Sequence, residues 1–463
     1  MSDILLLSMP YGKSYGKIDI ESLDFGVPPV GLAYIGSYLK SAGCDVRLVD
    51  LMFSTSNWEE VRTLIHKESP KWLGISATTP QINEAFTTAK IAKKLNPDMQ
   101  VVIGGIHASA LPEETLSNEN IDILVYGEGE MTMLELVEGK VIDQIEGIYY
   151  KRDQKIIKNP PRSLENDLDK FPYPLYEDLP LERYGGEHVG ATLGIISSRG
   201  CPYQCTYCAA NTIHKRKFRK RSIENIVGEI EKFKHLFKVT KFSFYDDTFT
   251  LDKNRTVAIC EAIMKRDMNL EWNCITRGDS LTKPLLEIMK KAGCSMVQIG
   301  IESGSNEILR KAKRRETVEE NLQAVHWAKQ AGMEVVGLFI LGLPYETEET
   351  IKQTIEIAKK SKVDYAQFSI LVPLPGSEVW DLAQKGEAIE LITSNWEDFG
   401  RYGRSIIRLK GLDEDALSKY FVKAYKKFYM RPSYIIKKLG KVTNLASFLN
   451  LSKKGLVLLK LIK

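Results

Sequence analysis

The sequence predicts an α/β protein with two sheet-based domains, and three observations support this prediction. Short apolar runs alternate with amphipathic helical patterns over residues 3–140, and the same alternation resumes at residue 193. A Pro-rich stretch without long periodicity separates the two halves. The 463 residues suffice for about two or three domains, and 43% hydrophobic with 27% charged residues is an ordinary globular composition.

The first half predicts a Rossmann-like, doubly wound parallel sheet. Its opening residues contain an acidic side chain and only a short apolar run, which favours a first strand over a signal peptide. The expected strands are residues 3–8, 46–49, 72–76, 101–103 and 121–125. Helical patterns lie between them at 30–41, 57–68, 81–95 and 112–118.

Ligands of such sheets bind outside the carboxyl ends of the strands. Small and polar residues follow three of these strands, namely Ser76, Thr78, Gly104, Gly105, Gly127 and Glu128. Glycine allows a backbone to approach a large ligand closely. No G-x-G-x-x-G opens a helix after the first strand, which disfavours a nicotinamide site.

The second half predicts six strand–helix units, with strands at 193–198, 241–245, 271–276, 295–301, 334–341 and 365–371. Helices are expected at 223–236 with Ser222 as N-cap, and at 253–266, 282–292, 317–331 and 348–360. We therefore divide the chain into residues 1–140, a hairpin and linker at 141–190, a barrel-like domain at 191–390, and a basic helical extension at 391–463.

A cluster of three cysteines lies directly after the first strand of the second half. Cys201, Cys205 and Cys208 form C-x3-C-x2-C, a spacing that suits a metal cofactor better than a hydrophobic core. No fourth cysteine lies nearby, and His214 opens a basic loop, so three ligands are expected. The remaining cysteines are scattered in apolar segments and are expected to be core thiols in a reducing compartment.

This motif resembles the cluster loop of the radical SAM superfamily, whose enzymes use S-adenosylmethionine (SAM). The resemblance implies a partial (β/α)6 barrel and a 4Fe–4S cluster held by Cys201, Cys205 and Cys208. The open iron of that cluster chelates the amino and carboxylate groups of SAM, and an electron then cleaves SAM to a 5′-deoxyadenosyl radical. The radical abstracts hydrogen from the substrate, with an electron supplied by a reductant such as ferredoxin or flavodoxin.

The same resemblance suggests residues that contact SAM at the other strand ends. Asp246 and Asp247 stand where the family commonly has Gly-Gly-Glu for the amino group, and either could make that contact. Arg277 could face a carboxylate, and Glu302 stands where the family contacts ribose or the methionine end. Two more candidates are Tyr207 and Gly342. Tyr207 stands at the family's aromatic position beside adenine, and Gly342 belongs to a segment of the fifth strand that matches the family's motif only loosely.

The first half resembles the cobalamin-binding domain, in which a Ser/Thr-bearing loop and a Gly-Gly end successive strands. Ser76 and Thr78 match the loop, and Gly104-Gly105 matches the Gly-Gly. The D-x-H-x-x-G of mutases, whose His ligates cobalt, is absent, since none of the six histidines has Asp two residues earlier. Cobalamin-binding radical SAM enzymes commonly share this absence. A Rossmann-like domain without cofactor is the alternative.

Together the two resemblances imply a cobalamin-dependent radical SAM enzyme, of the class B methylase type. We expect methyl transfer to an unactivated carbon or phosphorus centre of a small-molecule or lipid-like substrate. One alternative is a radical SAM enzyme that catalyses cyclisation, oxidation or dehydration, with or without cobalamin. Another is a non-catalytic iron–sulfur protein that docks on a membrane.

Two basic segments stand out in a chain of net charge +4. The run 214–221 could grip phosphates, but a solvated loop is the preferred interpretation, and no nucleic-acid partner is expected. Residues 416–463 contain twelve Lys or Arg and no Asp or Glu. Their short amphipathic pieces suggest a peripheral membrane contact, although no apolar run is long enough to span a bilayer. We expect a cytoplasmic protein, with membrane association as a further hypothesis.

Overall fold

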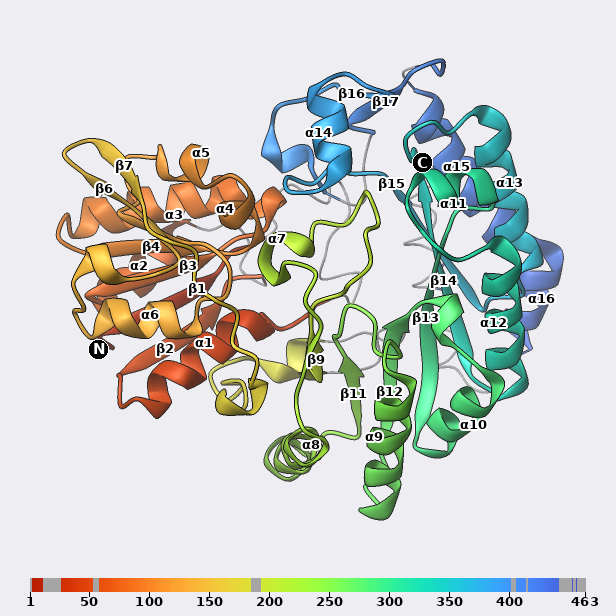
Figure 1. Cartoon of the computed structure of the whole chain (residues 1–463), viewed down its shortest axis with the longest axis horizontal. Helices are drawn as coiled ribbons and strands as arrows, with labels where there is room; N and C mark the ends of the chain where they lie inside the picture. The colour runs from red at the N-terminus through yellow and green to blue at the C-terminus, as the bar shows by residue number, and fades with distance from the viewer. Residues whose placement is uncertain are drawn as a thin grey trace.

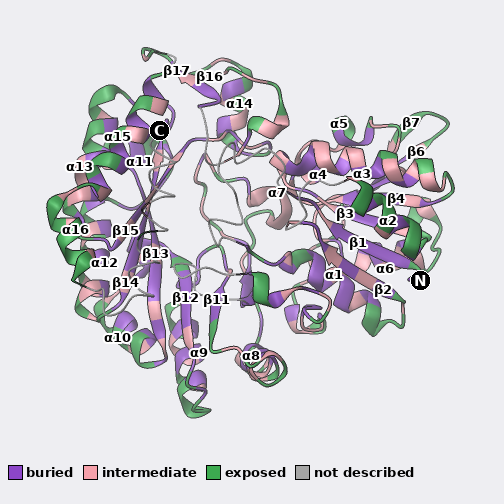
Figure 2. Cartoon of the chain, turned by 180° about the vertical axis from the view of Figure 1, so that it is seen from behind, coloured by how far each residue is buried: buried purple, intermediate pink, exposed green. Residues whose placement is uncertain are grey.

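The computed structural model describes residues 2–10, 26–52, 58–184, 193–400, 405–413, 415–440, 452 and 455. Two sheets, each flanked by helices, lie side by side and are joined by an irregular segment (Figure 1). Each sheet forms the centre of one domain, and buried residues concentrate along its strands (Figure 2). The two α/β halves expected from the sequence are therefore confirmed.

Within the described residues, the first sheet has the order β2-β1-β3-β4-β5-β6-β7. Its strands are β1 (Ile4–Ser8), β2 (Val46–Asp50), β3 (Trp72–Ser76), β4 (Gln100–Gly104), β5 (Ile123–Val125), β6 (Ile148–Arg152) and β7 (Lys155–Lys158). Its helices are α1 (Val30–Ser41), α2 (Trp58–Glu68), α3 (Ile82–Leu95), α4 (Ile106–Ala110), α5 (Pro112–Leu116) and α6 (Glu130–Val137).

Strand β1 lies inside this sheet and is apolar on both faces. Leu5 and Leu7 belong to one hydrophobic core, whereas Ile4 and Leu6 belong to the other. Parallel sheets covered by helices on both sides require such continuous apolar strands. Because β1 lies between β2 and β3, the chain reverses its winding direction there, and the strand ends diverge into a crevice.

The hairpin assigned to the linker extends the first sheet. Strand β6 pairs antiparallel with β5, with Ile148 opposite Val125, and β7 pairs with β6. The turn contains Asp153 and Gln154 at φ 49° and 63°, the left-handed conformation that a tight turn demands. The sequence predicted the hairpin itself. It did not predict that β6 pairs with β5, because strands some 25 residues apart leave no local pattern that shows they pair.

The second sheet is parallel, with the order β15-β14-β13-β12-β11-β8 in the described residues. Its strands are β8 (Leu193–Ile195), β11 (Lys241–Phe244), β12 (Glu271–Thr276), β13 (Cys294–Glu302), β14 (Glu334–Leu341) and β15 (Tyr365–Ile370). The covering helices are α8 (Ile223–Phe237), α9 (Lys253–Lys265), α10 (Lys283–Lys291), α11 (Asn306–Lys311), α12 (Val318–Gln330) and α13 (Glu348–Lys360). Ser222 caps α8 as expected, since its side chain accepts a hydrogen bond from the N–H of Asn225.

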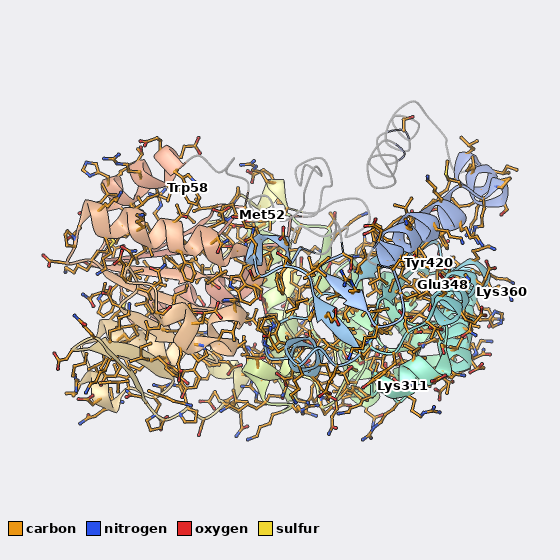
Figure 3. All side chains as sticks on the ribbon, turned by 90° about the horizontal axis from the view of Figure 1, so that it is seen from above. Met52, Trp58, Lys311, Glu348, Lys360 and Tyr420 are labelled. Atoms are coloured by element: carbon orange, nitrogen blue, oxygen red, sulfur yellow. The ribbon has the colours of Figure 1, made fainter. Side chains whose placement is uncertain are left out.

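Helix α15 (Ala416–Tyr429) covers the edge strand β15. The hydroxyl of Tyr429 bonds both the N–H and the carbonyl of Ala366, and that of Tyr425 does the same at Phe368. These bonds satisfy polar groups that an open sheet edge would expose. The helix also packs on α13, where Tyr420 lies beside Glu348 (Figure 3).

A small lobe between the sheets holds α14 (Glu378–Gln384) and a two-stranded antiparallel sheet, β16 (Ile389–Leu391) and β17 (Ile407–Leu409). The extension expected to be helical thus also contains strands. The lobe touches the first domain, because the indole N–H of Trp396 donates to Glu114 over 3.0 Å.

The C-terminal helix α16 (Pro432–Leu439) exposes Ile435, Ile436 and Leu439. Apart from residues 452 and 455, the tail beyond 440 lies outside the described residues, as does most of the expected amphipathic pair. Among the described helices, none is long and apolar enough to cross a bilayer. Membrane contact therefore stays a prediction.

Candidate functional site

The three cysteines lie on the loop that follows β8, at the carboxyl end of the second sheet. Strand β9 (Ser198–Arg199) and Gly200 precede them. Gly200 has φ +87°, and a Cβ there would overlap the carbonyl oxygen of Lys217, so only glycine fits. Cys201 and Cys205 are half-buried and Cys208 is exposed, which leaves all three thiols reachable.

Their donor chemistry fits an iron–sulfur cluster, since clustered thiolates are the usual ligands. In the described part of the chain, no three His, Cys, Asp or Glu side chains are already set around a metal position. Burial raises the pKa of Cys208 to about 11, so this thiol is protonated until a metal replaces its proton.

Asp246 braces the start of the cysteine loop. Its carboxylate accepts hydrogen bonds from the N–H groups of Ser197 (2.7 Å) and Ser198 (3.1 Å) and from both serine hydroxyls. Arg255 completes the arrangement by donating to Ser197. The Asp246 side chain is 2% exposed, and this burial raises its pKa. These partners occupy Asp246 inside the protein.

Asp247 points the other way and is exposed. Desolvation raises its pKa, while His214 and the N–H of Gly200 oppose that shift. Both aspartates lie in the loop after β11, where Asp246 is buried and Asp247 is exposed. Asp247 is the carboxylate left accessible to a ligand.

Arg277 lies against the cysteine loop. Its guanidinium stacks over the ring of Tyr203 at 3.7 Å and approaches the sulfur of Cys205 at 3.9 Å. Asp279 binds the same guanidinium through two hydrogen bonds of 3.0 and 2.7 Å. The arrangement holds a positive charge beside a cluster ligand, where it would stabilise negatively charged sulfur.

Tyr207 and Glu302 meet at Arg314, a residue that the sequence analysis did not single out. Arg314 donates to the Tyr207 hydroxyl (2.9 Å), lies 3.4 Å from the Glu302 carboxylate, and also pairs with Glu316. Glu302 has φ +62° where the register of β13 shifts, and its burial raises its pKa. Three expected SAM residues, Tyr207, Arg277 and Glu302, therefore surround one buried charge network.

Gly342 ends β14 with φ +95°, and Glu346 folds back onto it. The Glu346 carboxylate accepts from the N–H groups of Gly342 (2.7 Å) and Leu343 (3.2 Å), while its other oxygen is buried without a partner in the described residues. Burial raises the pKa of Glu346 to about 8. The sequence analysis did not identify Glu346. The signal available for it was the Gly-x-x-x-Glu spacing from Gly342 to Glu346.

A groove of about 440 Å³ opens at the carboxyl ends of the first sheet. Leu6, Leu32, Val102, Val125 and Met133 form apolar walls, and the backbone of Ser76 and four glycines (Gly104, Gly105, Gly127 and Gly129) lines the mouth. A Cβ at Gly105 would lie 2.6 Å from the Ala77 carbonyl, and one at Gly129 would lie 2.9 Å from Ile35. An apolar slot bordered by free backbone fits the bulky nucleotide end of cobalamin.

Two of the expected cobalamin residues have other partners. The Thr78 hydroxyl bonds to the Gln81 side chain (2.7 Å) in a capping box, and Thr78 does not line the groove. Glu128 pairs with Arg219 and Arg199 and lies 3.5 Å from His214. Although burial opposes it, hydrogen bonds from His214 and Arg219 hold the pKa of Glu128 well below its usual range.

Arg199 joins the two domains two residues before Cys201. It donates to Glu130 over 2.7 Å and to Glu128 over 3.2 Å, and its guanidinium lies 5.0 Å from the ring centres of both Tyr34 and Phe171. The side chain is almost fully buried. The cysteine loop is thus tied to the loop that lines the groove, an arrangement the sequence analysis did not anticipate.

Fold and site together define a two-domain protein with a Rossmann-like cobalamin-type groove and a three-cysteine barrel loop. The radical SAM superfamily description matches residues 195–358, and the B12 binding domain description matches residues 16–137.

An uncharacterised methyltransferase of Pyrococcus horikoshii is 35% identical over 89% of this chain and 89% of its own length. The anaerobic magnesium-protoporphyrin IX monomethyl ester cyclase of Rubrivivax gelatinosus is 30% identical over 88% of this chain and 75% of its own length.

Two solved structures share the fold. The radical SAM methyltransferase TsrM of Kitasatospora setae, solved with cobalamin and a 4Fe–4S cluster, aligns with a TM-score of 0.71 at 18% identity, covering 94% of this chain and 90% of TsrM. The cobalamin-dependent radical SAM enzyme OxsB aligns with a TM-score of 0.74 at 21% identity, covering 98% of this chain and 70% of OxsB. This chain belongs to the radical SAM superfamily and carries a B12-binding domain.

Proposed function

We propose that this enzyme is a cobalamin-dependent methyltransferase that acts on an unactivated carbon or phosphorus centre of a small molecule. The observation that carries the proposal is the Arg199 link, which holds the three-cysteine loop against the loop lining the cobalamin-type groove. A methyl carrier and a radical source must act on one substrate, so their sites have to share a fixed geometry.

When bound, the cluster, SAM and cobalamin supply the one-electron chemistry and the methyl group. The chain's own residues orient and shield them. Cys201, Cys205 and Cys208 would hold iron, and the exposed Asp247 carboxylate would accept hydrogen bonds from the SAM ammonium. Arg277 and the Tyr207–Arg314–Glu302 group bind the remainder of SAM in a water-poor setting, where charge-assisted hydrogen bonds are stronger.

Ser76, Gly104, Gly105 and Gly127 line the groove and would hold the nucleotide end of cobalamin, and no histidine is among the lining residues. His107 is the histidine nearest in sequence to these glycines, but it packs between Thr79 and Trp396 and does not line the groove.

The reductant is a low-potential carrier such as ferredoxin or flavodoxin. We keep residues 1–140, 141–190, 191–390 and 391–463 as proposed functional units, with hairpin β6–β7 structurally part of the first.

One observation favours a second candidate, a radical reaction of another outcome such as ring closure. The relative from Rubrivivax gelatinosus is named a cyclase and aligns along 88% of this chain. Both candidates use the same cofactors and the same loop residues, and they differ in the fate of the substrate radical.

Anaerobic reconstitution with iron, sulfide and hydroxocobalamin tests the proposal. We expect about one cobalamin per chain, SAM cleavage under dithionite, and both 5′-deoxyadenosine and S-adenosylhomocysteine among the products. Formation of 5′-deoxyadenosine without S-adenosylhomocysteine would favour the second candidate. Protein that binds no cobalamin at micromolar concentration would exclude the methyltransferase.

A further inference from the structure

The basic run 214–221 separates into two parts with different surroundings. Arg219 and Arg221 are 5% and 4% exposed, and each pairs with a carboxylate, Glu128 and Glu229 respectively. Lys220 pairs with Asp252 over 2.9 Å. These cations are structural, because each one is bound to an acidic side chain.

Lys215, Arg216 and Lys217 remain exposed. Within the described residues, no carboxylate forms an ion pair with any of them. Lys215 and Arg216 have φ of 48° and 58°, a conformation that non-glycine residues rarely adopt and that the surrounding structure must hold. We name these three residues the basic turn.

The basic turn lies directly on the cysteine loop. The Lys217 carbonyl lies so close to Gly200 that a Cβ there would overlap it, and Arg216 donates to the Tyr203 carbonyl over 3.2 Å. Gly200 and Tyr203 flank Cys201, the first cluster ligand. Three exposed positive charges, none with an ion-pair partner among the described residues, therefore lie next to the cysteine loop.

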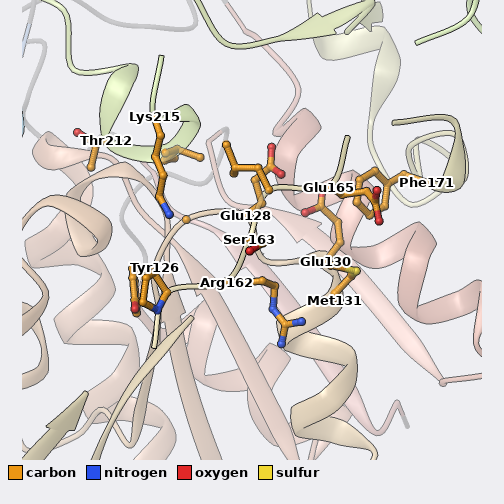
Figure 4. A pocket seen from close by; sticks show the side chains of 14 residues that line it. Tyr126, Glu128, Glu130, Met131, Arg162, Ser163, Glu165, Phe171, Thr212 and Lys215 are labelled. Carbon is orange, nitrogen blue, oxygen red and sulfur yellow. The ribbon is translucent and has the colours of Figure 1, made fainter. Parts of the chain in front are cut away.

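A hollow of about 470 Å³ borders the turn. It lies between the segment 161–165, the loop around Glu128 and helix α7 (Asn211–His214), and Lys215 extends into it (Figure 4). The hollow itself has a mixed lining, with Glu128, Glu130 and Glu165 beside Arg162 and Lys215. The positive charge of this surface therefore comes from the exposed side chains of the basic turn, which suit an acidic partner.

We propose that the basic turn is the docking surface for an acidic electron-carrier protein that reduces the cluster. This inference rests on the proposed function, because that chemistry needs one electron for each SAM cleaved. The carrier is oxidised by one electron and the cluster is reduced by one. Opposite charges raise the rate at which the two proteins meet, and positions next to the cluster ligands keep the transfer distance short.

The test uses the full-length reconstituted enzyme and reduced flavodoxin, an acidic carrier. Lys215→Glu/Lys217→Glu reverses two charges and leaves the Arg216 hydrogen bond in place. Lys290→Glu/Lys291→Glu on α10 is the matched control, since both lysines are exposed and α10 packs between α9 and α12 on β13, away from the edge strand β8. Stopped-flow absorbance follows oxidation of the flavodoxin at 20 mM and 500 mM salt.

We expect the second-order rate at low salt to fall at least tenfold in the basic-turn variant and to stay within twofold in the control. At 500 mM salt the three proteins should react at similar rates, because charges are screened within about 4 Å. A low-salt rate in the basic-turn variant equal to that of the wild type would overturn the proposal, as would a wild-type rate independent of salt.

Dithionite separates this inference from the proposed function. SAM cleavage driven by dithionite should be unchanged in both variants, since a small chemical reductant needs no docking surface. If dithionite produces no cleavage in the wild type, the proposed function itself fails. If the basic-turn variant transfers electrons normally but loses a gel shift with a single-stranded RNA that the wild type binds, the turn is a nucleic-acid surface and the inference is wrong.

Discussion

Arg199 and Glu130 form an ion pair of 2.7 Å across the boundary between the two domains. Arg199 lies in the strand that leads into the cysteine loop, and Glu130 begins the helix that follows the groove loop. Both side chains are buried, and the rings of Tyr34 and Phe171 enclose the guanidinium. The pair sets the position of the cysteine loop relative to the loop that lines the groove.

Substitution of one residue of this ion pair should therefore lower both the stability of the fold and the methylation rate, which depends on the relative position of the two loops. Arg199→Met leaves the buried Glu130 carboxylate without its cation, while Glu128 keeps Arg219, so we expect the free energy of unfolding to fall by about 3 kcal/mol. Urea unfolding followed by circular dichroism measures this change.

The paired variant Arg199→Met/Glu130→Gln provides the control, because it removes the uncompensated charge of Glu130. It should recover part of the stability but not the methylation rate, since the geometric link remains broken. Full methylation by Arg199→Met at wild-type cofactor loading would contradict a positioning role.

Asp246 and Asp247 should respond differently to the same substitution. Asp246→Asn turns one of the two carboxylate oxygens, each of which accepts two hydrogen bonds that brace the cysteine loop, into a donor, so we expect lower thermal stability and lower iron content. Asp247→Asn should keep the cluster and weaken SAM binding about tenfold, because one charge-assisted hydrogen bond is lost. Iron analysis and SAM titration by electron paramagnetic resonance distinguish the two variants. Lower iron content in Asp247→Asn together with weaker SAM binding in Asp246→Asn would contradict the roles assigned to these residues.

The groove of the first domain can be blocked without disturbing its sheet. A Cβ at Gly104 meets its nearest neighbour, the Val125 carbonyl, at 3.5 Å, an ordinary contact. Gly104→Leu should therefore fold, fill the groove and weaken cobalamin binding at least tenfold, measured by the absorbance of bound cobalamin. Gly31→Leu at an exposed position of helix α1 is the control, since nothing lies within 4 Å of a Cβ there. Retained cobalamin in Gly104→Leu would place the ligand elsewhere.

His107 should make stability depend on pH. Burial lowers its pKa from 6.5 to about 4, so the folded protein keeps the imidazole neutral while the unfolded chain binds a proton below pH 6.5. Stability is lost as the pH falls from 6.5 towards 4, by up to about 3 kcal/mol. Among the described residues, the Thr79 hydroxyl and the Trp396 ring face the imidazole, and neither changes charge in this range.

Urea titrations of wild type and His107→Gln at pH 7.5, 6.0 and 5.0 measure this contribution. The difference between the two proteins should shrink as the pH falls, because the variant lacks the titrating group. His66→Gln, on helix α2, serves as the control and should keep the pH dependence of the wild type. A constant difference across the three pH values would contradict the prediction.

Several features could be determined from the sequence alone because they depend on neighbouring residues. Periodicity placed the strands and helices of both sheets to within a few residues, as with helix 348–360, and Ser222 was identified as a cap. The C-x3-C-x2-C spacing indicated the cluster chemistry because all three ligands lie within eight residues. The family and the class of fold followed from these local patterns.

Only the tertiary structure decided which polar groups face one another. Arg199 and Glu130 are 69 residues apart, so no local pattern joins them. Asp246 and Asp247 are adjacent, yet the packing of β8 against β11 turns one inward and leaves the other accessible. Thr78 and Glu128 lie at the expected strand ends, but their side chains have other partners. Thr78 bonds to Gln81 in a capping box, and Glu128 pairs with buried arginines. Chain spacing decides which element a residue occupies, whereas packing between distant segments decides what its side chain can bind.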